Sequence, residues 1–159
     1  LYHCPHPPTP LTPRQILGGA FDRLPESLRI CFAHGGGAFP YLLGRLENAW
    51  HQRSIARGCS MHPPSHYLDR FSVDSAVFDE RALRLLIETM GPHRVMLGSD
   101  YPFPLGDLEI GAFINDMGLE QNVVEDIFAN AALEWLNIDK SRFEIGGTNK
   151  GSFALSEKG

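Results

Sequence analysis

The hydrophobic positions of this chain follow two spacings that alternate along the sequence. Apolar residues three and four positions apart predict helices over 13–24, 40–50, 80–90, 107–117 and 120–136. Short apolar runs between them predict strands over 28–33, 70–76 and 95–98. Local signals support the boundaries: Thr12-Pro13 is a typical helix start, Asp79 is a typical N-cap, and Gly91-Pro92 ends a helix. Residues 58–66 are predicted to form a loop.

Strands that alternate with helices are typical of an α/β fold with a parallel sheet. Rossmann-like sheets and (β/α)₈ barrels both fit this order. No G-x-G-x-x-G or G-x-x-x-x-G-K-[ST] motif follows a predicted strand, so the nucleotide-binding versions are disfavoured.

Composition narrows the possible partners. The 159 residues carry a formal net charge of −5 without a Lys/Arg cluster, so a nucleic-acid partner is not expected. No apolar run approaches the roughly 18 residues that a membrane-spanning helix needs. Cys4, Cys31 and Cys59 are few, odd in number and far apart, which favours reduced thiols and a cytoplasmic location.

The two ends differ in composition from the middle. Residues 1–12 are Pro-rich and are predicted to form an irregular arm. Residues 13–140 hold all the predicted elements, and residues 141–159 are expected to be a flexible Gly/Ser/Lys-rich tail. Because the chain begins with Leu, we expect it to be a processed product or a fragment.

Polar residues stand at the ends of the three predicted strands. His34 ends the first strand in "ICFAHGGG", Asp74 lies near the end of the second, and Asp100 follows the third in "LGSDYPFPLG". The carboxyl ends of parallel strands lie on one face of an α/β fold, where reactive residues are usually found. A histidine and a carboxylate that meet there favour a metal site or a general acid/base pair.

Each of these residues also has a structural interpretation. His34 can donate to a backbone carbonyl, and Asp100 can cap the turn that Pro102 and Pro104 enforce. For Asp74 we favour a structural hydrogen-bond acceptor. Arg45, by default, is a solvated surface arginine.

Other motifs carry less weight. His3 and His6 have metal-like spacing but lie among prolines, and His62 and His66 flank a Pro-Pro loop and are expected to be solvated. The "HGGG" motif also builds the oxyanion hole of lipases, but that interpretation needs a G-x-S-x-G nucleophile motif, which the sequence lacks.

Longer stretches resemble a known family. The segments "ILGGAFDRLPESLRICFAHGGGAFPYLLGR", "DRFSVDSAVFD" and "RVMLGSDYPFPLG" resemble the carboxy-terminal part of the decarboxylases of the amidohydrolase superfamily that act on 2-amino-3-carboxymuconate 6-semialdehyde. The resemblance runs from about residue 13 to about residue 140.

The resemblance implies a distorted (β/α)₈ barrel with one catalytic zinc ion, of which this chain contains about strands 6–8 and their helices. It implies that Asp100 is a zinc ligand and that His34 is the general acid/base beside the metal. It further implies that Arg45 binds a substrate carboxylate in a neighbouring subunit, so that the enzyme is a homodimer, and that Phe103 lines the substrate pocket. The reaction would release CO₂ from the small carboxylated semialdehyde in tryptophan catabolism.

The chain also departs from that family. The H-x-H pair of the family's first strand and the histidine of its fifth strand are not present. One carboxylate is too few ligands for a catalytic zinc ion, and three strands cannot close a barrel. We therefore expect the isolated chain to be inactive. The alternatives are a related decarboxylase or hydrolase for another carboxylated substrate, and a non-catalytic remnant that pairs with other chains.

Overall fold

Three short parallel strands form the centre of the fold. The computed structural model describes residues 15–143. Within them, β1 (Cys31–Phe32), β2 (Ser72–Asp74) and β3 (Val95–Met96) pair in the order β1-β2-β3. Both ladders are parallel, with Phe32 opposite Val73 and Asp74 opposite Met96. The parallel α/β arrangement that the sequence predicts is therefore confirmed.

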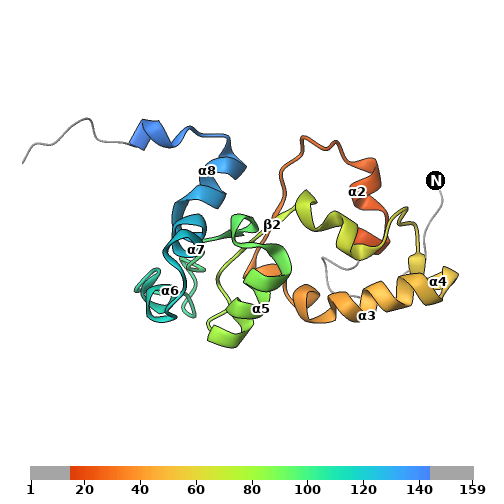
Figure 1. The fold of residues 1–159 in the computed structure, drawn as a ribbon, viewed down its shortest axis with the longest axis horizontal. Coiled ribbons are helices and arrows are strands. Elements are labelled where there is room, and N and C mark those ends of the chain that lie inside the picture. Colours follow the sequence, from red (N-terminus) through yellow and green to blue (C-terminus); the bar gives the residue numbers. More distant parts are fainter. Residues whose placement is uncertain (1–14, 144–159) are drawn as a thin grey trace, which may run out of the picture.

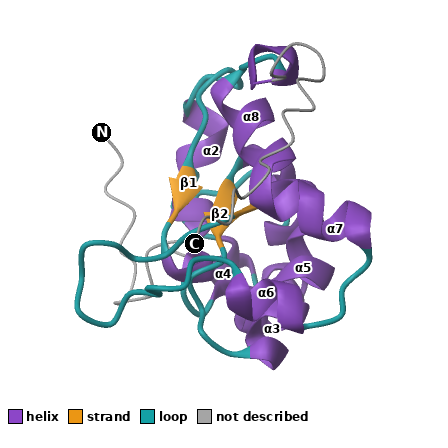
Figure 2. Ribbon diagram, turned by 90° about the vertical axis from the view of Figure 1, so that its left-hand side faces the viewer, coloured by secondary structure: helices purple, strands orange, loops and turns teal. Residues whose placement is uncertain are grey.

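Helices pack against this small sheet. Figure 1 shows α2, α3 and α4 to one side of β2 and α6, α7 and α8 to the other, and Figure 2 shows helices above, below and to the right of the strands, with loops to their left. The helices are α2 (Ala20–Arg23), α3 (Phe39–Gln52), α4 (Ser54–Arg57), α5 (Glu80–Met90), α6 (Ala112–Asp116), α7 (Gln121–Glu125) and α8 (Ala131–Leu136). Short 3₁₀ helices cover His34–Gly36, Pro64–Arg70, Pro92–Arg94 and Lys140–Phe143, and a π-helix covers Asp126–Asn130.

The strands are shorter than predicted because the chain leaves the ladders early. After β1 the backbone turns at His34, whose φ of 56° is incompatible with an extended strand. After β3, the next N–H that faces β2 is that of Gly98, and it donates to the side-chain oxygen of Ser75 (3.1 Å) and not to a backbone carbonyl. A run of apolar residues indicates that a segment is buried. A β-ladder also needs a neighbouring segment in an extended conformation to pair with, so the apolar run overestimates the length of the strand.

Two helix predictions are confirmed closely. The long helices α3 and α5 lie where the apolar spacing places them. At the start of α5, the Asp79 carboxylate accepts a hydrogen bond from the Ala82 N–H at 2.9 Å, which is the predicted N-cap. The predicted helix over 120–136 is present as α7, the π-helix and α8 in direct succession.

Other element predictions are wrong in part. The first predicted helix is interrupted before α2 at Gly19, whose φ is 66° and where a Cβ would overlap the Cys59 carbonyl oxygen. The predicted helix over 107–117 shrinks to α6, because the Asp107 side chain accepts from the Glu109 N–H and Gly111 takes φ 85°. The last part of the predicted loop over 58–66 belongs to the 3₁₀ helix that begins at Pro64.

Phe71 lies at the centre of the hydrophobic core, with 1% of its surface exposed. Its ring lies 5.3 Å from that of Phe32, 5.6 Å from that of Phe21 and 5.6 Å from that of Phe39. These rings come from β1, α2 and α3, so one side chain joins the sheet to the helices beside it.

The predicted arm over 1–12 lies outside the described residues, as does the tail beyond Phe143. Of the predicted tail, residues 141–143 end a 3₁₀ helix. Within residues 15–143, no helix is long and apolar enough to cross a membrane.

Candidate functional site

The structure brings His34 and Asp100 together at the carboxyl ends of β1 and β3. The imidazole Nε2 lies 3.2 Å from Oδ1 of the Asp100 carboxylate, and a proton on Nε2 would be donated to that oxygen. The His34 side chain is 63% exposed, and that of Asp100 is 20% exposed. The carboxyl ends of parallel strands share one face, and this rule correctly predicts that the two side chains meet although they are 66 positions apart in the chain.

Both residues adopt a backbone conformation that is uncommon for residues other than glycine. The φ angle is 56° at His34 and 59° at Asp100, in the left-handed region that non-glycine residues rarely occupy. Such conformations cost on the order of 1–3 kcal/mol each and cluster at functional sites. The strain at both members of one contacting pair favours a functional site over a simple turn.

Asp74, the third residue at a strand end, accepts hydrogen bonds from backbone N–H groups. Its Oδ1 accepts hydrogen bonds from the Gly35 N–H at 3.0 Å and from the Ala76 N–H at 3.2 Å. This is the structural hydrogen-bond acceptor that the sequence analysis favours.

The glycines after His34 serve two purposes. A Cβ on Gly35 would lie 2.6 Å from Val77 Cγ1 and 3.2 Å from Leu86 Cδ2, so this buried residue must be small and must accept a φ of 60°. At Gly37 a Cβ would meet nothing within 4 Å. The first glycine is thus required by packing, and the last leaves open space.

A shallow pocket of about 280 Å³ opens beside the pair. It is lined by His34, Asp100, Phe103, Pro104 and Leu105. Phe103 and Leu105 are 64% and 84% exposed, so they form an apolar wall open to solvent. Sequence reasoning identifies Phe103 but not Pro104 or Leu105, although both follow it in the "DYPFPLG" motif.

Arg45 lies apart from this pocket. It is an exposed residue of α3, and its side chain has no hydrogen bond or ion pair with any described residue. It is not among the residues that line the pocket beside His34. Within one copy of the chain, the structure does not bring Arg45 to the other predicted site residues.

The remaining histidines form no metal centre within the described part of the chain. The rings of His62 and His66 contact each other at a tilt of 31°, with centroids 4.1 Å apart, while His3 and His6 lie outside the described residues. No group of three or more His, Cys, Asp or Glu side chains in residues 15–143 is arranged to hold a metal ion. Because a catalytic zinc ion usually has three protein ligands, His34 and Asp100 alone do not complete a metal site.

Cys31, on β1, is not an activated thiol. Partial burial, together with the negative charge of Asp74, raises its pKa to about 11. The thiol therefore stays protonated at neutral pH, and nucleophilic chemistry needs the thiolate.

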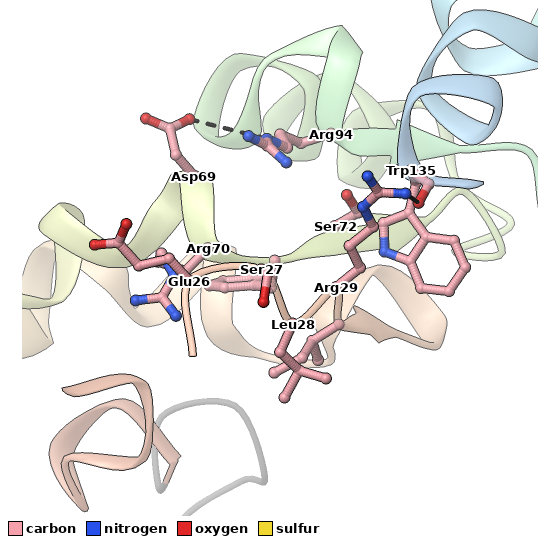
Figure 3. A pocket seen from close by; sticks show the side chains of 11 residues that line it. Glu26, Ser27, Leu28, Arg29, Asp69, Arg70, Ser72, Arg94 and Trp135 are labelled. Carbon is pink, nitrogen blue, oxygen red and sulfur yellow. Dashed lines mark hydrogen bonds and ion pairs between the residues drawn. The ribbon is translucent and has the colours of Figure 1, made fainter. Parts of the chain in front are cut away.

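Figure 3 shows a different pocket, of about 290 Å³, whose lining includes the residues directly before β1 and β3. Two of its three arginines are held by backbone carbonyls. Arg29 donates to the carbonyl of Trp135 at 2.7 Å, and Arg70 donates to three carbonyls, one within α2 and two directly after it. Arg94 lies 3.9 Å from Asp69. This pocket is at the amino ends of the strands, so the His34–Asp100 pocket is the better candidate.

These features define a class of protein: an α/β protein with a histidine–carboxylate pair at the carboxyl ends of parallel strands, where enzymes of this architecture hold their reactive groups. Comparison with known proteins identifies the family. The family described as amidohydrolase matches residues 3–138, and the chain belongs to it. Membership of this family implies a TIM-barrel-type α/β fold.

Two curated relatives agree with the resemblance seen in the sequence. The 2-amino-3-carboxymuconate-6-semialdehyde decarboxylase of Dictyostelium discoideum is 42% identical over 130 residues, which is 80% of this chain and 36% of the relative. The enzyme of the same name from Caenorhabditis elegans is 39% identical over 128 residues, which is 79% of this chain and 32% of the relative. The chain thus spans about a third of the length of these relatives.

Solved structures show the same likeness. The 5-carboxyvanillate decarboxylase of Sphingomonas paucimobilis matches with a TM-score of 0.69 and 28% identity over 80% of this chain and 38% of its own. The 5-carboxyvanillate decarboxylase of Novosphingobium aromaticivorans, in complex with manganese, matches with a TM-score of 0.65 and 29% identity over 80% of this chain and 38% of its own.

Proposed function

We propose that this chain supplies the carboxy-terminal part of the active site of a metal-dependent decarboxylase. The observation that carries the proposal is the 3.2 Å contact between His34 and Asp100 at the strand ends. In this proposal β1, β2 and β3 correspond to about strands 6–8 of a distorted (β/α)₈ barrel, formed by residues 13–140.

The proposed substrate is 2-amino-3-carboxymuconate 6-semialdehyde, the compound in the names of both curated relatives. The products would be 2-aminomuconate 6-semialdehyde and CO₂. The bond between the substrate carbon and its carboxylate breaks, its electron pair stays on that carbon, and a proton takes the place of CO₂.

We propose Asp100 as one ligand of a divalent metal. Its Oδ1 faces His34, whereas its Oδ2 has no hydrogen-bond partner among the described residues. The other ligands would have to come from outside the described residues. Zinc is the metal that the resemblance implies, and manganese, which is bound in the Novosphingobium aromaticivorans decarboxylase, is the alternative.

His34 would exchange the proton. Its exposed imidazole lines the pocket and is aligned by the Asp100 carboxylate, and imidazole can accept or donate a proton near neutral pH. After CO₂ leaves, His34 Nε2 would deliver the proton to the substrate carbon.

The remaining predicted site residues would bind the substrate. Phe103 lies in the pocket wall, where it would contact the carbon skeleton of the semialdehyde. Arg45 is exposed and outside the pocket of its own chain, so we propose that it reaches the pocket of a second copy and binds a substrate carboxylate there. This role requires a homodimer.

A second candidate substrate is a carboxylated aromatic ring. Two structural relatives above 25% identity are 5-carboxyvanillate decarboxylases, and the exposed Phe103 offers a surface on which a ring can stack.

A decarboxylation assay tests the proposed function. Since the chain spans about a third of its relatives, the assay uses a chimera in which it replaces the matching stretch of the Dictyostelium discoideum enzyme. We expect the chimera to consume 2-amino-3-carboxymuconate 6-semialdehyde with release of CO₂, and the isolated chain to be inactive. Preference for 5-carboxyvanillate would favour the second candidate. A folded chimera that decarboxylates neither compound, beside an active parent enzyme, would contradict the proposal.

The location we propose is the cytoplasm. Cys31 and Cys59 form no disulfide among the described residues, as is usual for proteins in a reducing compartment.

A further inference from the structure

We infer that Asp74 is a positioning residue that fixes the orientation of His34, an inference that rests on the function proposed for that histidine. Asp74 is the last residue of β2, the central strand, and lies between the chain segments that carry His34 and Asp100. It is not among the residues that line the pocket, so it acts through its neighbours and not on the substrate.

The first contact of Asp74 is with the peptide group that follows His34. Its Oδ1 accepts the Gly35 N–H at 3.0 Å. This N–H belongs to the peptide bond between His34 and Gly35, so the carboxylate holds the backbone directly attached to the histidine. Hydrogen bonds to a charged carboxylate are roughly twice as strong as neutral ones.

The peptide group between His34 and Gly35 requires stabilisation in its observed conformation. His34 has a φ of 56° and Gly35 a φ of 60°, so two successive residues are in the left-handed region. Left-handed conformations are unfavourable for residues with a Cβ and persist only where the surroundings enforce them. Asp74 and the packing of Gly35 against Val77 and Leu86 provide that enforcement.

The second contact of Asp74 is with the segment that leads to Asp100. A Cβ on Gly98 would lie 2.8 Å from the Asp74 Cβ and 3.1 Å from its Cγ, so the backbone of Gly98 packs directly on this side chain. The neighbouring Ser75 Oγ accepts the Gly98 N–H at 3.1 Å. Gly98 is two residues before Asp100.

One side chain therefore touches both segments of the catalytic pair. On one side it bonds to the residue after His34, and on the other it packs against the residue two before Asp100. We conclude that Asp74 sets the separation of the imidazole and the carboxylate, which is 3.2 Å in this structure.

The test is an NMR comparison of the 159-residue chain with its Asp74→Ala and Asp74→Asn variants. In Asp74→Ala the Gly35 N–H loses its acceptor, so we expect its amide to exchange with solvent at least about 10-fold faster, equivalent to about 1.4 kcal/mol. The ring-proton resonances of His34 should shift at the same time. Asp74→Asn keeps an acceptor oxygen, and we expect smaller changes in the same direction.

Asp79→Ala is the matched control. It also removes a carboxylate that accepts a backbone N–H, here that of Ala82 at the start of α5. The control is expected to lower stability but to leave the Gly35 and His34 resonances in place. Changes in the control as large as those in Asp74→Ala would overturn the inference, because they would show general loosening.

Unchanged Gly35 exchange and His34 resonances in Asp74→Ala would also overturn it. If Asp74→Ala does not fold, the same comparison is made with Asp74→Asn, and unchanged signals in that variant would overturn the inference. These signals do not depend on turnover. An inactive chimera combined with the expected NMR changes would contradict the proposed function and leave the positioning role in place.

Discussion

Replacement of His34 by alanine is expected to lower the kcat of decarboxylation by about 10²–10⁴-fold, the usual contribution of a general acid or base. The variant removes the imidazole that faces Asp100 at 3.2 Å and lines the pocket. Because the side chain is 63% exposed, its loss leaves no cavity in the core, and the thermal stability should change little. The measurement is the steady-state rate of the chimera, with and without the substitution.

The control for this experiment is His66→Ala. His66 is also exposed, but its ring contacts that of His62 and does not line the pocket. A His66→Ala chimera should keep its rate within about 2-fold, as expected for a surface substitution away from the site. An unchanged rate in His34→Ala would show that His34 transfers no proton in the reaction.

Replacement of Phe71 by alanine is expected to destabilise the fold by about 3–5 kcal/mol, as for other buried aromatic residues. Phe71 is 1% exposed and its ring contacts those of Phe21, Phe32 and Phe39, so truncation leaves a cavity between the sheet and two helices. The total stability of a domain is about 5–15 kcal/mol, so the variant is expected to unfold at a much lower urea concentration.

The matched control is Phe143→Ala, since Phe143 is 64% exposed. Urea unfolding of this variant should differ from that of the unsubstituted chain by less than about 0.5 kcal/mol. Equal destabilisation by the two substitutions would contradict the position of Phe71 at the centre of the core.

The sequence predicts the parallel sheet, the long helices and the meeting of His34 with Asp100, because each follows from a local signal combined with one general rule. Apolar spacing identifies α3 and α5, and parallel strands bring their carboxyl ends to one face. The rule concerns strand ends in space, so it holds although His34 and Asp100 are 66 residues apart in the chain.

Other features depend on tertiary contacts that no local pattern records. Gly35 is required because Val77 and Leu86 pack where its Cβ would be, and neither is near it in the sequence. The strand lengths depend on where hydrogen bonds leave the ladder, as at Gly98, whose N–H donates to the Ser75 side chain. The double contact of Asp74 appears only when Gly35 and Gly98 are placed beside it.

The most direct test of the account is the metal content of the chimera with and without Asp100→Ala, measured by elemental analysis after dialysis. If this chain contributes a ligand to a metal-dependent site, the chimera should hold about one divalent metal ion per chain, and the Asp100→Ala variant much less. A folded Asp100→Ala chimera that retains one metal ion per chain would contradict the account, because Asp100 would then not be a ligand.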